Sequence, residues 1–222
     1  MTKEDIIIIK NLQDGNIYTD EDISSLVELS IDDVKKATKY QVNKDELVID
    51  GSGVIYIMDI KYDTIVDGEG FRNTVYCAKC NFKCTECHNP QSHDIHNGKP
   101  ITINNLCDLL LENGNDITFS GGECTLQCKA FIKLAKMLKE KDRNIWLYTG
   151  NIFENLLKDK CYYELLQYID VLVDGRFDIN KKKLGLVFKG STNQRIIDVK
   201  NTLKTGEIVI YEDNSQAKLS SV

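Results

Sequence analysis

The sequence of 222 residues lacks any apolar run that approaches the roughly eighteen residues of a membrane-spanning helix. The segment that begins at Met1 leads into a mixed acidic stretch and has no signal-peptide pattern. These two absences argue against a membrane protein and against a secreted one. We therefore expect a cytoplasmic protein without a membrane partner.

Arginine is missing from residues 1–56, which hold six Lys against twelve Asp and Glu. This imbalance accounts for the whole formal charge of −6, because the other residues carry equal numbers of both signs. Attraction to the phosphates of nucleic acid needs excess positive charge. We therefore do not expect either half of the chain, taken as a whole, to attract nucleic acid.

Histidine is scarce, with three residues, whereas cysteine is abundant, with eight. In a reducing compartment, clustered cysteines are more often metal ligands than disulfides. With 42% hydrophobic residues, a chain of this length can bury one full core and has room for a small extra domain.

Residues 1–56 are predicted to form that extra domain, with three helices followed by a hairpin at 46–57. This layout resembles the winged helix-turn-helix domain of biotin-repressor-type regulators. Its expected recognition helix begins Ser30-Ile31-Asp32-Asp33 and would bring two carboxylates to the DNA. The sign of that charge favours a docking or regulatory domain over DNA binding. A helical extension that packs on the core is the simpler alternative.

From residue 54 onward, short apolar strands alternate with helices, which predicts a parallel α/β sheet that is curved but not fully closed. The expected strands are Val54–Lys61, Asn73–Cys77, Asp116–Phe119, Asn144–Tyr148, Val171–Val173, Leu184–Phe188 and Glu207–Tyr211. The expected helices are Ile103–Leu111, Leu126–Lys139, Phe153–Tyr168 and Asn193–Leu203.

Three motifs each follow a predicted strand: Ser120-Gly121-Gly122-Glu123, Thr149-Gly150 and Asp174-Gly175-Arg176. Parallel sheets place ligands at the carboxyl ends of their strands. The shared position predicts one pocket that contains all three motifs.

The cysteines at Cys80, Cys84 and Cys87 have a spacing that can hold three irons of a four-iron cluster and leave the fourth open. Glu123, behind two glycines, would suit a small zwitterion bound to that open iron. Two alternatives use Cys77 as well, namely a four-cysteine zinc site and a fully ligated electron-carrying cluster.

The spacing CxxxCxxC with a downstream Gly-Gly-Glu resembles the radical S-adenosylmethionine superfamily. The segments Trp146–Gly150, Val171–Phe177 and Gly190–Arg195 follow in the order found in activating proteins of anaerobic ribonucleotide reductases. The resemblance covers roughly residues 57–212. It implies an incomplete parallel (β/α) barrel over residues 57–222, preceded by the small N-terminal domain.

The resemblance implies that Cys80, Cys84 and Cys87 ligate a catalytic [4Fe-4S] cluster, whose open iron is chelated by S-adenosylmethionine. Gly121 and Gly122 would let the backbone approach this cofactor, and Glu123 would face its amino group.

Four further residues are implied to contact the cofactor. Asp174 and Arg176 would touch it, and an arginine fork suits its carboxylate. Thr149 and Asn193 would contact its ribose or adenine.

The implied function is reductive cleavage of S-adenosylmethionine to install a glycyl radical on the large subunit of an anaerobic ribonucleotide reductase. A flavodoxin- or ferredoxin-type protein would be the reductant. One alternative is an activase of another glycyl-radical enzyme, because His88-Asn89-Pro90 is closer to the sequences of such activases than to those of the reductase activators. The others are a radical enzyme acting on a small molecule and a winged-helix iron–sulfur redox sensor.

The sequence departs from the pattern at three positions. Lys79 replaces the glycine common before the first cluster cysteine, Glu86 replaces an aromatic residue or glycine, and Cys124 stands where proline normally follows Gly-Gly-Glu. Cys77 and Cys124 are interpreted as redox-active or as pocket lining. The other cysteines are expected to be small buried residues: Cys107, Cys128 and Cys161. His93 and His96 are expected to be solvated.

Overall fold

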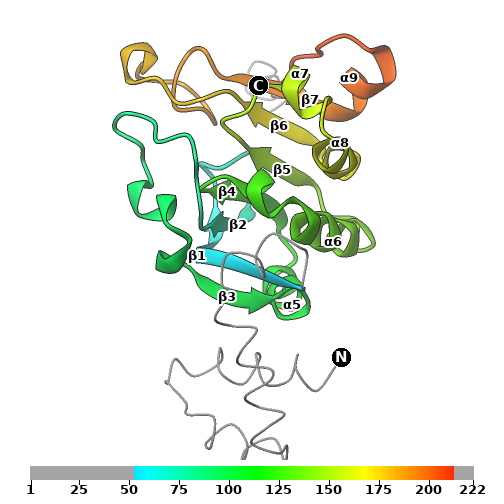
Figure 1. The fold of residues 1–222 in the computed structure, drawn as a ribbon. Helices are drawn as coiled ribbons and strands as arrows, with labels where there is room; N and C mark the ends of the chain where they lie inside the picture. Colours follow the sequence, from blue (N-terminus) through cyan, green and yellow to red (C-terminus); the bar gives the residue numbers. More distant parts are fainter. Residues whose placement is uncertain (1–52, 213–222) are drawn as a thin grey trace, which may run out of the picture.

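The computed structural model describes residues 53–212, which contain one open sheet in the order β3-β1-β2-β4-β5-β6-β7 (Figure 1). The strands β2, β4, β5 and β6 run parallel, whereas β1, β3 and β7 are antiparallel to their neighbours. Their bounds are Val54–Thr64 (β1), Arg72–Cys77 (β2), Lys99–Thr102 (β3), Asp116–Gly121 (β4), Ile145–Tyr148 (β5), Val171–Asp174 (β6) and Arg195–Asp198 (β7).

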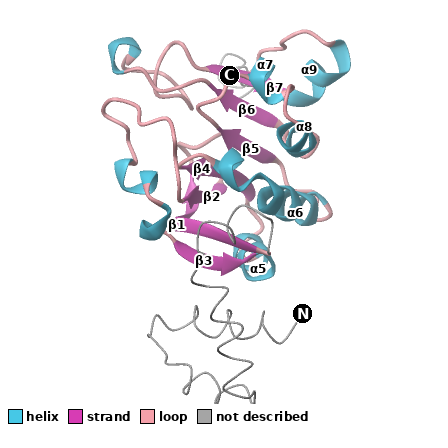
Figure 2. Ribbon diagram, in the orientation of Figure 1, coloured by secondary structure: helices cyan, strands magenta, loops and turns pink. Residues whose placement is uncertain are grey.

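Helices cover one face of the sheet, with α6 packed between α5 and α8 (Figure 2). The α-helices are α5 (Ile103–Leu111), α6 (Cys128–Lys139), α7 (Phe153–Leu156), α8 (Lys160–Leu166) and α9 (Val199–Thr205). Four 3₁₀ turns complete the structure: η1 (Pro90–His93), η2 (Ile95–Asn97), η3 (Cys124–Gln127) and η4 (Ile179–Lys181). No helix within residues 53–212 is long and apolar enough to cross a membrane.

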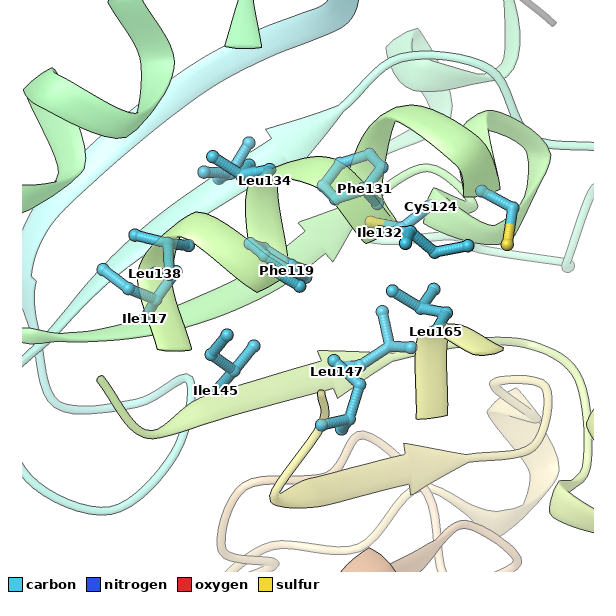
Figure 3. Close-up of a cluster of buried hydrophobic side chains, with 14 of the residues drawn as sticks. Ile117, Phe119, Cys124, Phe131, Ile132, Leu134, Leu138, Ile145, Leu147 and Leu165 are labelled. Carbon is cyan, nitrogen blue, oxygen red and sulfur yellow. The ribbon is translucent and has the colours of Figure 1, made fainter. Parts of the chain in front are cut away.

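The core lies between α6 and the central strands (Figure 3). Phe131, Leu134 and Leu138 recur at helical spacing and give α6 one apolar face. Phe119 of β4 meets Phe131 edge-to-face, with ring centroids 4.9 Å apart. This packing holds β4 and β5 side by side, so that their carboxyl ends can present a site.

The opposite face of the sheet buries an arginine. Arg72 donates from Nε to the Thr118 hydroxyl at 2.7 Å and from Nη2 to the Ile117 carbonyl at 2.6 Å. Its guanidinium lies 5.3 Å from the ring centroid of Trp146. Burial lowers the pKa of Arg72 to about 10, so the side chain remains charged and its hydrogen bonds offset the cost of burial.

Two predicted strands are not regular strands. Leu184–Phe188 is irregular because Gly185 and Phe188 have φ of 80° and 55°, which a strand does not accommodate. In Glu207–Tyr211 only one bridge forms, between Ile210 and Ile197. The prediction of a parallel sheet is right for the four central strands only.

Two predicted helices are also corrected. The segment predicted as Asn193–Leu203 begins with the strand β7 and becomes helical only at Val199. The segment Phe153–Tyr168 contains two helices, because Asp159 caps a new helix through the N–H groups of Cys161 and Tyr162. The predicted winged helix of residues 1–56 lies almost entirely outside the described residues.

Candidate metal centre

The three cysteines of the CxxxCxxC motif lie in the loop that follows β2, and each is half-buried. The residue directly before each cysteine has a left-handed backbone: Lys79 with φ of 74°, Lys83 with 48° and Glu86 with 52°. Such conformations are costly for residues other than glycine and cluster at functional sites. The chain thus turns sharply ahead of every cysteine in the motif.

Backbone N–H groups lie near all three sulfurs. Those of Phe82 and Lys83 lower the pKa of Cys80, and that of Phe177 lowers the pKa of Cys84, against the larger effect of burial, which raises both. The N–H of Asn89 donates to Cys87 Sγ at 3.4 Å. Backbone donors to sulfur stabilise thiolates and tune the irons they bind. The donor set of this loop therefore fits an iron–sulfur cluster.

Burial raises the pKa of both Cys80 and Cys84, and the neighbouring Cys87 contributes to both shifts. The three cysteines are therefore close enough to sense one another. Within residues 53–212, no group of three His, Cys, Asp or Glu side chains is gathered that could hold a metal ion.

The zinc alternative also needs Cys77, which the structure places elsewhere. Cys77 is fully buried in the core, and its sulfur lies 3.2 Å from that of Cys124. Burial, with the Cys77 thiol as the next cause, raises the pKa of Cys124 well above its ordinary value. The two sulfurs thus lie in contact with each other within the hydrophobic core.

The Gly-Gly-Glu turn at the end of β4 holds the cysteine loop by its backbone. The N–H of Gly122 donates to the Cys77 carbonyl, and that of Glu123 donates to the Lys79 carbonyl, each at 2.8 Å. A Cβ on Gly122 would lie 2.4 Å from the Lys79 carbonyl oxygen, and one on Gly121 would lie 2.4 Å from the Cys77 nitrogen. The sequence predicts that these glycines let the backbone approach a cofactor. In the structure they also allow two chain segments, the end of β4 and the start of the cysteine loop, to lie in close contact.

Glu123 is almost completely buried and joins the ends of β4 and β5. Its Oε1 accepts from the hydroxyls of Thr125 at 2.7 Å and Thr149 at 2.9 Å, and its Oε2 accepts from the Gly150 N–H at 2.9 Å. Burial raises the pKa of Glu123, and these hydrogen bonds oppose the rise. Two predicted site residues, Glu123 and Thr149, are thus brought into direct contact.

The segment after β6 closes over the cysteine loop. The guanidinium of Arg176 lies 4.5 Å from the ring centroid of Phe82, which stands between Cys80 and Cys84. The same ring packs on Gly150, where a Cβ would come within 2.4 Å of it. Sequence reasoning missed Phe82, because nothing in the CxxxCxxC spacing indicates that an intervening residue packs on two strand ends.

Asn193 supports this segment by donating from Nδ2 to the Arg176 carbonyl at 2.8 Å. Phe177 lies against His88, with ring centroids 4.6 Å apart. The two other histidines differ, because His96 is exposed and hydrogen-bonded to Asp94 whereas Nε2 of His93 is buried without a partner. The solvated state expected of both is found for His96 only.

Asp174, predicted to contact the cofactor, is 1% exposed, as Glu123 is, and its carboxylate is already engaged by groups of the protein. Its carboxylate accepts two hydrogen bonds from Arg195, across the β6–β7 pair, and one from the Phe153 N–H at 2.8 Å. Arg195 also forks onto Glu154, whose pKa it lowers to about 2. Asp174 therefore acts as an anchor for Arg195, a pairing that no local spacing indicates.

We expect Asp174→Asn to lower the free energy of unfolding by about 2–4 kcal/mol, because a buried charge pair loses one partner. Denaturant unfolding of the apoprotein measures this. Glu154→Gln is the matched control, since its exposed carboxylate contacts the same arginine and should cost less than about 1 kcal/mol. Equal effects of both variants would contradict the anchoring role.

We expect Gly122→Ala to lower the iron bound after anaerobic reconstitution, because the added methyl group forces the turn away from the cysteine loop at a cost of about 1–3 kcal/mol. Iron and sulfide analysis measures the loss. Gly114→Ala is the control: its φ of 76° strains any side chain, but a Cβ there meets nothing within 4 Å, so it weakens the fold without pushing on the cysteine loop. Wild-type iron content in Gly122→Ala would show that the contact is dispensable.

Comparison with known proteins agrees with this geometry. Residues 66–197 match the family described as a 4Fe-4S single cluster domain. The chain is 31% identical over 143 residues to the anaerobic ribonucleoside-triphosphate reductase-activating protein of Pasteurella multocida, across 60% of this chain and 90% of that protein. Its namesake in Enterobacteria phage T4 is 30% identical over 152 residues, or 62% and 93% of the two chains.

The pyruvate formate-lyase-activating enzyme of Clostridium pasteurianum is 32% identical over 117 residues, across 49% of this chain and 47% of that enzyme. The match therefore extends to activating enzymes that are named for different targets. Because the family match spans more than half of the chain and includes all three loop cysteines, the protein belongs to the 4Fe-4S single cluster domain family, among the anaerobic ribonucleoside-triphosphate reductase-activating proteins.

Proposed function

We propose that this protein is a radical S-adenosylmethionine activase that installs a glycyl radical on an anaerobic ribonucleotide reductase. One observation carries the proposal: the loop of Cys80, Cys84 and Cys87 has backbone N–H groups near every sulfur and follows β2, at the carboxyl ends of the parallel strands. The relatives that align over nine-tenths of their length carry the name of this activity.

When bound, the [4Fe-4S] cluster supplies the single electron that breaks the bond between the sulfur and the 5′ carbon of S-adenosylmethionine, so that a carbon radical can take hydrogen from a partner's glycine. The three cysteines would hold the cluster. The backbone clamp at Gly122 and Glu123 would fix the loop, because its two hydrogen bonds join the loop to the end of β4.

Glu123 is proposed to receive the amino group of the cofactor through Oε2. This oxygen accepts one hydrogen bond, from Gly150, whereas Oε1 accepts three, so Oε2 has lone-pair capacity left. Thr149 would then act by orienting the carboxylate. Gly121, directly before Gly122, would let the backbone lie close to the end of β2 and to the cofactor.

Arg176 and Asn193 are proposed to form the cofactor-facing wall that follows β6. Arg176 rests on Phe82 beside Cys84, which suits the carboxylate of a cofactor held at the cluster. Asn193 holds the backbone of Arg176 by donating to its carbonyl. Asp174 would contribute to cofactor binding as a positioning residue, through Arg195 and the turn at Gly175.

The open sheet supports the proposal of an incomplete (β/α) barrel of the radical S-adenosylmethionine type, with a side opening for a glycine-bearing loop of the partner. We propose residues 57–222 as this catalytic domain; the family match over residues 66–197 lies within it, and β1 extends it back to Val54. Residues 1–56 are proposed as a docking or regulatory domain. A flavodoxin- or ferredoxin-type protein would supply the electron.

A pyruvate formate-lyase-type partner is the second candidate target. The relative from Clostridium pasteurianum favours it, although that match covers about half of each chain. Exposing the reconstituted protein to each glycyl-radical enzyme in turn, and recording the glycyl radical by electron paramagnetic resonance, decides between the two targets.

We expect the anaerobically reconstituted and reduced protein to convert S-adenosylmethionine to 5′-deoxyadenosine and methionine, and Cys84→Ala to abolish this. Cys84→Ala removes one of three thiolates that hold the cluster. Chromatographic analysis of 5′-deoxyadenosine measures the reaction. Cys161→Ala is the matched control, because Cys161 is another half-buried cysteine but lies on α8, outside the loop.

Three results would count against the proposal. A loaded, reducible cluster without cleavage of S-adenosylmethionine would show that this protein does not have the activity. Zinc in place of iron after purification without oxygen would show that it does not hold the proposed cluster. Equal loss in Cys161→Ala would show that the effect of Cys84→Ala is not specific to the loop.

A further inference from the structure

A strongly basic loop stands out in the described part of the protein. Residues 181–189, here called the lysine loop, read Lys-Lys-Lys-Leu-Gly-Leu-Val-Phe-Lys and contain no acidic residue, whereas the chain after residue 56 carries equal numbers of both signs. Figure 1 shows the segment after β6, in gold, projecting beyond the strand ends on the same side as the green loop that follows β2.

The tip of the lysine loop is exposed in both its charge and its apolar surface. Lys182 and Lys183 are exposed and form no ion pair within residues 53–212, whereas Lys181 makes only a 3.5 Å pair with Asp178. Leu184 is fully exposed, and Val187 is 46% exposed. Leu184 thus places one large apolar side chain next to exposed lysines at the tip of the loop.

The base of the lysine loop is firmly held, so its tip is presented from a fixed place. The Tyr148 hydroxyl donates to the Phe188 carbonyl at 2.8 Å, and Phe188 packs edge-to-face on Trp146. At the other end, the N–H of Thr192 donates to the Lys181 carbonyl at 2.9 Å. The lysine loop is therefore built into the fold at both ends.

The lysine loop adjoins the proposed cluster. The backbone N–H of Phe177, four residues ahead of it, lies near the Cys84 sulfur, and the Phe177 ring lies 4.6 Å from that of His88. Gly190, directly after it, packs on the ring of Phe177, where a Cβ would lie within 2.9 Å. The residue directly after the lysine loop thus packs on Phe177, whose backbone lies near a cluster cysteine, and a protein seated on the loop would approach the cluster from this side.

We propose that the lysine loop is the docking site for the electron-donor protein, a small electron carrier with an acidic surface around its redox group. This inference rests on the proposed function, which requires an external electron for every cleavage. Electron-transfer encounters are small and transient, and opposite charges accelerate them. Lys182 and Lys183 would steer the donor, and Leu184 would supply the central apolar contact.

Other occupants fit less well. A glycyl-radical enzyme must insert a glycine-bearing loop into the pocket, which requires a larger interface than one exposed leucine and its flanking charges. A second copy of this chain and a nucleic acid would also be attracted by the lysines, but neither has any need to sit beside the cluster. Each of these occupants predicts a different outcome when the lysines are reversed in charge.

The test compares Lys182→Glu/Lys183→Glu with the wild type in anaerobic stopped-flow reduction of the oxidised cluster. Reduced flavodoxin, an acidic protein donor, is one reductant, and dithionite, a small molecule, is the other. We expect the bimolecular rate with flavodoxin to fall about tenfold or more at low salt, and the difference to shrink at high salt. The rate with dithionite should stay unchanged.

Lys136→Glu/Lys141→Glu is the matched control. It makes the same change of charge at two exposed lysines near the carboxyl end of α6, at the edge of the sheet away from the strand ends that carry the site. Its rates should equal those of the wild type at the same ionic strength, apart from the small effect of net charge. A second variant, Leu184→Ser, leaves the charge intact and should slow reduction by flavodoxin alone.

Several outcomes would overturn the inference. These are wild-type reduction of the charge-reversed variant by flavodoxin, an equal loss with dithionite, and an equal loss in the control. Normal reduction with impaired radical transfer to the reductase would assign the lysine loop to that partner. A changed oligomeric state, or salt-sensitive binding of nucleic acid without a reduction defect, would assign it to a second copy or to nucleic acid.

The two proposals fail separately. Cluster reduction is measured without S-adenosylmethionine, so it decides the docking site even if the protein cleaves no cofactor. Conversely, 5′-deoxyadenosine produced with dithionite supports the activase function even if the lysine loop has no effect on the donor.

Discussion

The site depends on two backbone hydrogen bonds between the end of β4 and the start of the cysteine loop. They are the bonds from Gly122 to the Cys77 carbonyl and from Glu123 to the Lys79 carbonyl. Because both partners are backbone groups, the spacing between the turn and the loop is set by main-chain geometry, and no side chain can stand between them. The glycines are thus required by the fold before any cofactor is considered.

This clamp also places the first carboxylate. Once the Glu123 backbone is fixed, its side chain reaches the end of β5 and meets Thr149 and Gly150. At the end of the neighbouring strand β6, Asp174 has the equivalent role, because it secures Arg195 and the start of α7. Two buried carboxylates thus lock successive strand ends together, and the cost of burying each charge is offset by three or more donors.

Local spacing was sufficient for the cysteine loop, the glycine turn and the four central strands, because each depends on neighbours in the sequence. It failed where a contact links distant segments. Leu184–Phe188 alternates like a strand, yet Gly185 and Phe188 turn it out of the sheet. The segment that starts at Asn193 has helical spacing, but Arg195 is drawn into β7 by its pairing with Asp174. Phe82 belongs to the same class, since its partners follow β5 and β6.

The departures at Lys79 and Glu86 now have a physical meaning. Both residues hold left-handed backbones, with φ of 74° and 52°, where glycine would be unstrained. A side chain there costs on the order of 1–2 kcal/mol per residue, which the contacts on either side of the loop must offset. Those contacts are the clamp to β4 and the stack of Phe82 between Gly150 and Arg176. A loop that carries such strain and is held at both ends is pre-shaped for its ligand, so that binding a cluster orders little further chain.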